Sequence, residues 1–240
     1  MPRYRRVVVK LSGEALAGPA GAGVDPASLA QVADELLSVH ELGVQVAVVV
    51  GGGNHFRGRM AAGWGISRAE ADNIGMLGTV MNALMLRGVL TARTDNDIRV
   101  MTAIPMQSVA EPFIRLRAIR HLGQGLIVIL AGGIGQPYVT TDYPAVQRAL
   151  ELEADALLVA KRGVDGVYDS DPNVNPSAVR YTRLTYDEAL AAGVRVMDTS
   201  ALVLAKEQGL TMHVFDVAAV GVMRRICEGA DLGTRIDAKR

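Results

Sequence analysis

The stretch VQVAVVVGGG, residues 44–53, decides the fold class of this chain. Its first seven residues form an apolar, valine-rich run of the length and composition of a strand buried on both faces. Gly51, Gly52 and Gly53 follow directly, so the strand ends in a glycine turn. A strand of this kind is typical of a parallel sheet with helices on both sides.

The same alternation of strands and helices extends in both directions from this stretch. Short apolar runs predict further strands at 6–11, 98–102, 126–130, 156–160 and 211–215, and helical patterns cover 26–42, 69–90, 111–122, 142–150 and 217–227. We therefore predict an α/β protein, a three-layer α/β/α sandwich with a mostly parallel central sheet. No long linker divides the chain, which predicts one domain over 1–240 with lobes of about 1–155 and 156–240.

Two local features complete this reading of the elements. The glycine- and alanine-rich segment Gly18 to Gly23 is expected to be a loop. An Asp-Gly pair between apolar residues predicts a β-hairpin over Val164 to Tyr168.

Composition limits the classes of function. The 25 basic residues balance 25 acidic ones, which argues against a nucleic-acid binder that neutralises many phosphates. Cys227 is the only cysteine, so no disulfide forms within the chain. The N-terminal apolar run ends at Lys10, too early for a signal peptide, and the apolar segment 75–90 is shorter than a bilayer span. We expect a cytoplasmic protein with no membrane or nucleic-acid partner.

Three predicted strands end in glycine-containing turns, at residues 10–13, 51–54 and 132–135. Because right-handed crossovers place the carboxyl ends of parallel strands along one edge, these turns should lie close together where α/β sheets bind ligands. Glycine lets backbone N–H groups approach phosphate oxygens. One such turn is more often a purely steric requirement, whereas three on one edge favour a phosphate-binding site.

Familiar signatures of other activities are missing from the sequence. It has no P-loop, no dinucleotide-binding glycine motif, no protein-kinase signature and no serine-hydrolase elbow. The four histidines, at positions 40, 55, 121 and 213, lie too far apart for local metal-ligand spacing. We predict no metal site made by a side-chain cluster.

Individual charged residues carry the chemical hypothesis. Lys10 ends an apolar strand, where an unpaired ammonium is costly, and the adjacent Ser-Gly favours phosphate binding over a lysine that merely reaches solvent. Arg57 lies four residues past Gly53 and either holds a phosphate or pairs with a surface carboxylate. Asp142 begins a predicted helix at the ligand edge; it is either a helix cap or a group that orients Mg²⁺ or Lys10. Asp72 either faces an acceptor hydroxyl or is a surface aspartate.

The helix over 69–90 is apolar around most of its circumference, which indicates burial on more than one side. Packing within one chain is the simpler explanation. We favour an interface between copies of the chain, because this helix follows a predicted binding loop.

Taken together, these features resemble the bacterial uridylate kinases of the amino-acid-kinase family. The matching segments are KLSGEAL (10–16), VVGGGNHFRG (49–58), ADNIGMLGTVMNAL (71–84), GQPYVTTD (135–142), VDGVYDSDP (164–172), LTY (184–186), VMDTSA (196–201) and GTRI (233–236). They span nearly the whole chain in the family's order. The resemblance implies a kinase that transfers the γ-phosphoryl of ATP to UMP with Mg²⁺, in an N-terminal acceptor lobe and a C-terminal ATP lobe.

The resemblance also assigns roles to residues. ATP would be bound by Lys10, Leu11, Ser12, Gly13, Gly53, Arg57, Arg162, Tyr168 and Asp171. UMP would be bound by Gly52, Asp72, Ile134, Gly135, Gln136, Pro137, Tyr138, Val139, Thr140 and Thr141. Lys10 and Asp142 are the expected catalytic residues, with Lys161 a second charge stabiliser. Family members are homohexamers, usually activated by GTP and inhibited by UTP, so a homo-oligomer with these effectors is implied.

The chain departs from the family pattern at three positions: Ile134, Gln136 and Arg162, of which the last could add a cation beside ATP. Two alternative functions stay open at this point. One keeps the fold with a carboxylate or carbamate acceptor, as in amino-acid or carbamate kinases. The other is a nucleotide-binding storage or sensing protein without turnover.

Overall fold

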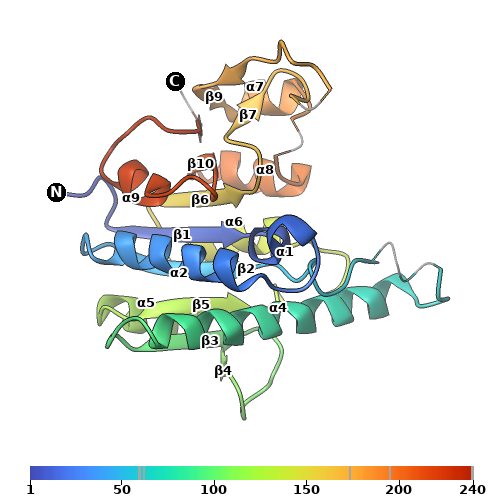
Figure 1. The fold of residues 1–240 in the computed structure, drawn as a ribbon, viewed down its shortest axis with the longest axis vertical. Helices are drawn as coiled ribbons and strands as arrows, with labels where there is room; N and C mark the ends of the chain where they lie inside the picture. The colour runs from blue at the N-terminus through green and yellow to red at the C-terminus, as the bar shows by residue number, and fades with distance from the viewer. Residues whose placement is uncertain (59–60, 62, 173, 195, 239–240) are drawn as a thin grey trace.

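The computed structural model describes residues 1–58, 61, 63–172, 174–194 and 196–238. Over these residues the main sheet runs in the order β4-β3-β5-β2-β1-β6-β10-β11-β9 (Figure 1). The strands are β1 (Arg6–Leu11), β2 (Gln45–Val50), β3 (Ile98–Thr102), β4 (Glu111–Pro112), β5 (Ile127–Ala131), β6 (Ala156–Lys161), β9 (Arg183–Thr185), β10 (Thr211–Asp216) and β11 (Thr234–Asp237). Among these pairings only β10–β11 is antiparallel, which confirms the mostly parallel prediction.

Helices cover both faces of this sheet. One layer holds α1 (Gly13–Ala17), η1 (Gly18–Ala20), α2 (Pro26–His40), α4 (Arg68–Thr91) and α9 (Val222–Cys227); the other holds α5 (Arg115–Gly123), α6 (Asp142–Glu151), α7 (Tyr186–Ala191) and α8 (Thr199–Glu207). Along β2, Val46, Val48 and Val50 belong to the first core, whereas Ala47 and Val49 belong to the second. The two cores confirm the three-layer prediction.

The hairpin predicted over Val164 to Tyr168 is wrong. Val167–Tyr168 (β7) pairs instead with Arg180–Tyr181 (β8) in a separate two-stranded sheet. A Cβ atom on Gly166 would lie 2.6 Å from the Thr234 hydroxyl oxygen, so the glycine permits close packing rather than a tight turn. The Asp-Gly signal was local, whereas the contact that decides the structure is distant in sequence.

Several element boundaries also differ from the predictions. The helix expected at 111 begins at Arg115, because residues 111–112 pair with β3 at the edge of the sheet. The helix expected at 217 begins at Val222, after a turn. Part of the expected loop 18–23 is helical, since Gly18–Ala20 continues directly from α1 as a 3₁₀ turn.

Helix α4 is longer than the apolar segment 75–90 considered above, and by length and composition alone it could cross a membrane. One side of the helix nevertheless packs in the protein core, where four of its side chains are buried: Val80, Ala83, Leu86 and Leu90. This burial is that of a core helix.

A buried carboxylate joins α2 to α9. Glu35 on α2 is 4% exposed, and its two oxygens accept the backbone N–H groups of Gly221 and Met223, the second at 3.1 Å. A carboxylate suits these N–H groups because the first turn of a helix has unpaired donors and a positive partial charge.

We expect Glu35→Ala to lower the free energy of unfolding by roughly 2–3 kcal/mol, because it leaves buried donors without a charged acceptor. Urea denaturation measures this change. The neighbouring Asp34→Ala is a matched control, since Asp34 is 68% exposed in its ion pair with Arg93 and should cost less than about 0.5 kcal/mol. Equal losses in the two variants would contradict the capping role.

Candidate active site

The centre of the site is an ion pair at the carboxyl end of the sheet. Lys10 is only 5% exposed, and its Nζ lies 2.7 Å from Oδ1 of Asp142, the first residue of α6. A buried ammonium requires such a partner, and a carboxylate at a helix N-terminus is stabilised by the helix dipole. The contact with Lys10 is one of the roles considered for Asp142 from the sequence.

A second ammonium group lies on the adjacent strand. β1 and β6 run in parallel with Leu11 opposite Ala160, so Lys161 extends from β6 at the same edge. Burial lowers the pKa of Lys161, the nearby charge of Lys10 lowers it further, and Asp142 partly opposes this. Lys10 and Lys161 thus place two ammonium groups at this edge, beside the carboxylates of Asp142 and Asp198, and such cations can stabilise a phosphoryl group.

The glycine turn after β2 lies directly beside the turn after β1. The N–H of Gly51 donates to the carbonyl of Leu11 at 2.7 Å, and a Cβ on Gly13 would come within 2.8 Å of the Gly53 nitrogen. Below the turn, the fully buried Asn82 amide of α4 donates to the Gly51 carbonyl at 2.7 Å and to Asn54 at 2.8 Å. Glycine thus permits the close approach, and Asn82 fixes the turn to α4.

A cavity of about 680 Å³ opens next to this turn. Its walls include Gly52, Gly53, Phe56, Arg57, Asp72, Met76, Thr79, Ile134, Gln136, Val139, Thr140 and Thr141. Of the residues expected to bind UMP, Gly135, Pro137 and Tyr138 are not on its wall in the described part of the chain. Arg57 and Gly53, expected at ATP, lie on this wall; Arg57 pairs with Glu14 at 2.7 Å and donates to the Gly53 carbonyl at 3.2 Å.

Asp72 holds one wall of this cavity in place. Its Oδ2 accepts the N–H of Tyr138 at 2.8 Å, and both of its oxygens accept from Arg68 at 2.9 Å. Tyr138 has φ of +67°, a conformation that residues with side chains rarely adopt. Asp72 therefore stabilises a strained turn in the 134–141 loop while its carboxylate faces the cavity.

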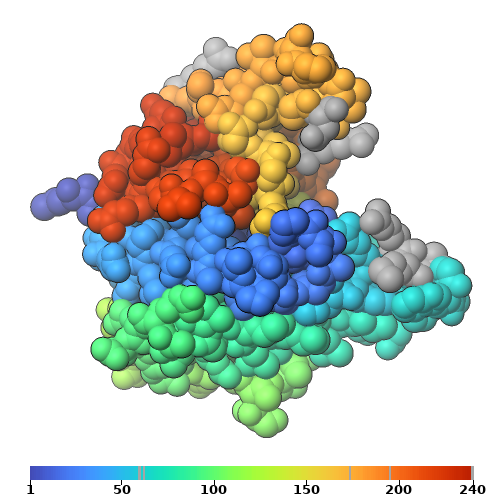
Figure 2. All heavy atoms as spheres, in the orientation of Figure 1, coloured from blue at the N-terminus to red at the C-terminus, as the bar shows by residue number. Residues whose placement is uncertain are grey.

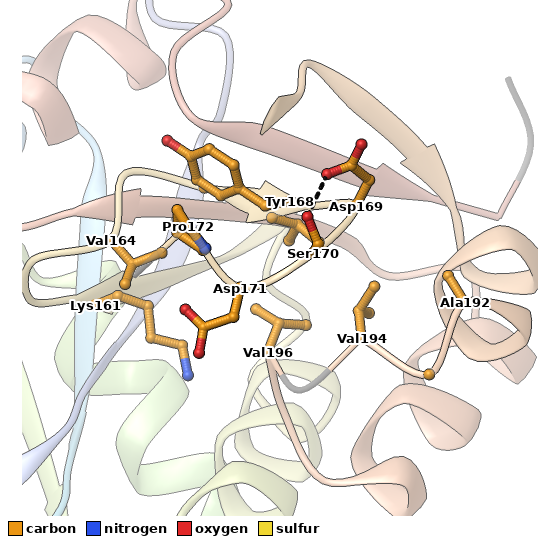
Figure 3. A pocket seen from close by; sticks show the side chains of 13 residues that line it. Lys161, Val164, Tyr168, Asp169, Ser170, Asp171, Pro172, Ala192, Val194 and Val196 are labelled. Atoms are coloured by element: carbon orange, nitrogen blue, oxygen red, sulfur yellow. Dashed lines mark hydrogen bonds between the residues drawn. The ribbon is translucent and has the colours of Figure 1, made fainter. Parts of the chain in front are cut away.

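A second cavity, of about 500 Å³, lies beyond Lys161 (Figure 3). Lys161, Tyr168 and Asp171 line it, together with the apolar side chains of Val164, Val167, Val194 and Val196. Figure 3 shows Lys161 and Asp171 extending into this pocket from different segments. Mixed apolar walls with a few polar groups suit a nucleoside.

Arg162 does not line this cavity among the described residues. Its guanidinium donates to the Ser28 hydroxyl at 3.0 Å, and Ser28 in turn donates to Asp25, the cap of α2. The extra cation expected beside ATP is thus engaged at the start of α2.

A third cavity, of about 480 Å³, lies next to the second one. Asp142, Lys161, Asp198 and Thr199 are among its lining residues, and Lys161 also belongs to the wall of the second cavity. Figure 2 shows the surface receding between the yellow and orange segment near 160–180 and the cyan segment that leads into α4. Asp142 lines this third cavity, while the preceding residue, Thr141, lines the cavity next to α4.

The geometry matches known proteins across the whole chain. Residues 5–216 match the model of the amino acid kinase family. The chain belongs to the amino acid kinase family. Amino acid kinases named uridylate kinase are similar to it over 99% of its length: that of Frankia alni is 60% identical and that of Frankia casuarinae 58% identical, with 93% and 92% of those proteins covered.

Solved structures of this kinase family agree. The UMP kinase of Bacillus anthracis is 55% identical with a TM-score of 0.96, over 99% of this chain and 97% of the other. The UMP kinase of Ureaplasma parvum is 31% identical with a TM-score of 0.91, over 98% and 99% of the two chains.

Sequence reasoning gave no role to several residues that the fold brings to the site. Asn82, Asp198, Val194 and Val196 are examples, and Asp198 lies in the segment 196–201 that carried part of the resemblance. A polar residue inside the apolar helix α4 was the available signal for Asn82. No local pattern pointed to Asp198.

Proposed function

We propose that this chain is a UMP kinase, which transfers the γ-phosphoryl group of ATP to UMP and yields UDP and ADP. The observation that carries the proposal is the charge arrangement at the sheet edge. Lys10 and Lys161 lie on adjacent strands, and Asp142 pairs with Lys10 at 2.7 Å near two cavities of nucleotide size. Relatives that are 55–60% identical over nearly the full length carry this activity in their names.

UMP occupies the cavity next to α4, and ATP occupies the cavity lined by Tyr168 and Asp171. The transferred phosphoryl group then lies above Lys10 and Lys161, whose charges stabilise the negative charge that develops on its oxygens. A phosphate monoester is largely dianionic at neutral pH and is its own nucleophile, so no general base is needed. Asp142 orients the Lys10 ammonium rather than removing a proton.

Mg²⁺ is the metal implied by phosphoryl transfer. The described residues contain no group of three His, Cys, Asp or Glu side chains able to hold an ion. This fits Mg²⁺, which keeps several waters and binds through substrate phosphates with one or two carboxylates, of which Asp142 would be one here. When bound, the ion would neutralise part of the negative charge of the ATP phosphates.

The remaining assignments concern the protein as a whole. We place the acceptor lobe at about 1–155 and the ATP lobe at about 156–240 of a cytoplasmic enzyme. Leu77 and Met81 are 46% and 50% exposed on the outer side of α4, which supports a homo-oligomer, as a hexamer, formed through this helix. Activation by GTP and inhibition by UTP complete the proposal.

The test measures ADP release from ATP and Mg²⁺ with UMP, CMP, AMP, acetylglutamate and aspartate as separate acceptors. Turnover restricted to UMP supports the proposal. Turnover with acetylglutamate or aspartate would make the chain an amino-acid kinase. ATP binding without turnover of any acceptor would identify a storage or sensing protein.

Asp72 gives a test of the acceptor cavity. We expect Asp72→Ala to raise KM for UMP by roughly 10-fold or more, because the cavity loses a charged acceptor and the turn at Tyr138 loses its support. KM for ATP should stay unchanged, since Asp72 does not line the ATP cavity. Steady-state kinetics with each substrate varied in turn separates the two constants, and an equal rise in both would place Asp72 elsewhere in the mechanism.

A further inference from the structure

Asp198 occupies the N-cap position of α8 but does not cap that helix. Its backbone is extended, with φ of −58° and ψ of 142°, and its carbonyl accepts the N–H of Ala201 at 3.0 Å. A carboxylate here ordinarily accepts an N–H from the first turn of its own helix. The side chain of Asp198 makes no such bond, so its carboxylate serves another purpose.

The carboxylate of Asp198 is directed at the acceptor loop instead. Its Oδ2 accepts the hydroxyl of Thr140, a residue 58 positions earlier that lines the cavity next to α4. The Thr140 hydroxyl also accepts the N–H of Asp142 at 3.2 Å. Since a hydroxyl has one proton to donate, Asp198 determines where that proton points.

The backbone of Asp198 acts on the other side of the same site. Its N–H donates to Oδ2 of Asp142 at 3.0 Å, while Oδ1 of Asp142 contacts Lys10 at 2.7 Å. The two oxygens of Asp142 are therefore divided between Lys10 and Asp198. This fixes the rotation of the Asp142 carboxylate and, through it, the position of the ammonium.

We propose that Asp198 is a positioning residue that couples the acceptor loop to the Lys10–Asp142 pair. Its carboxylate fixes Thr140 beside the acceptor, and its N–H fixes Asp142 beside the transferred group. Because both contacts come from one residue, a displacement of Thr140 also displaces Asp142. The inference rests on the proposed UMP kinase function and adds a residue to it.

The experiment compares Asp198→Ala, Asp198→Asn, Thr140→Val and the double variant Thr140→Val/Asp198→Ala by kcat, by both KM values and by Tm. We expect Asp198→Ala to lower kcat about tenfold or more, because Thr140 loses its acceptor and the acceptor loop is no longer tied to the segment whose backbone N–H holds Asp142. Asp198→Asn should recover most of this loss, since the amide oxygen still accepts from Thr140. The double variant should be no slower than the slower single variant, as coupled side chains are not additive.

A matched control separates positioning from helix stability. Thr185 caps α7 in the same part of the chain and accepts the N–H of Glu188 at 3.1 Å, away from the site. Thr185→Ala should lower Tm with kcat unchanged, whereas Asp198→Ala should lower kcat with a smaller shift of Tm.

Three results would overturn the inference. The first is an Asp198→Ala enzyme as fast as the unchanged chain, and the second is a double variant in which the two losses multiply. The third is a loss in Asp198→Ala that excess Mg²⁺ restores, which would make Asp198 a metal ligand instead. If the unchanged chain does not phosphorylate UMP, the proposed function is wrong. That result is obtained without any variant, so it is distinct from a failure of the inference about Asp198.

Discussion

Lys10→Ala is expected to lower kcat by a factor on the order of 10² or more, the loss that follows removal of one transition-state charge contact. The Nζ of Lys10 is buried, 2.7 Å from Asp142, which lines the cavity that also contains Lys161. Without it, one of the two ammonium groups facing the phosphoryl group is lost, and only Lys161 remains. Stopped-flow or coupled measurement of UDP formation gives kcat directly.

Lys206→Ala is the matched control for this variant. Lys206 is also a lysine paired with an aspartate, Asp187, at 2.5 Å, but it lies on the surface of α8. Its loss should leave kcat unchanged. A Lys10→Ala enzyme with turnover close to normal would remove Lys10 from the mechanism, whatever its effect on stability.

Gly52→Ala is expected to lower the free energy of unfolding by about 3 kcal/mol, because overpacking against backbone cannot be relieved by a side-chain rotation. A Cβ atom at Gly52 would lie 2.4 Å from the carbonyl oxygen of Gly75 and 2.8 Å from the nitrogen of Thr79. Both atoms belong to the backbone of α4, so the helix must move away from the glycine turn. Urea denaturation measures the loss.

The next residue supplies the control for Gly52. A Cβ atom on Gly53 would meet no atom within 4 Å, so Gly53→Ala should keep the stability of the unchanged chain. Similar losses in the two variants would show that the glycines are needed for backbone freedom and not for the approach of α4.

Much of the fold could be predicted because its signals are local. The valine-rich run at 44–50 predicts a strand and the following glycines predict its end, both from one short segment. β2 ends at Val50 as expected. The prediction of a hairpin near Gly166 was wrong for the opposite reason. Arg180, which pairs with Tyr168 and lies next to Gly166, comes from another part of the chain. The predicted start of α5 was wrong for a similar reason, because Glu111 pairs with β3 instead of beginning the helix.

The site divides in the same way. Lys10 could be found from sequence because a lysine ending an apolar strand is costly unless it has a partner. The sequence left the role of Asp142, 132 positions later, open, and the packing of α6 against β1 brings it into contact with Lys10. The bond between Asp198 and Thr140 has no sequence signal at all, since an aspartate before a helix predicts a cap.

The central position of β1 has a consequence for motion. β1 is hydrogen-bonded to β2 on one side and to β6 on the other, so a single sheet runs without interruption beneath both nucleotide cavities. A hinge that opened the two lobes as rigid bodies would have to break the ladder between β1 and β6, which is buried at every position of β1. We therefore expect movement of the segments at the sheet edge, residues 134–141 and 164–172, to admit substrates and release products. The strands of the sheet should keep their pairing during this movement.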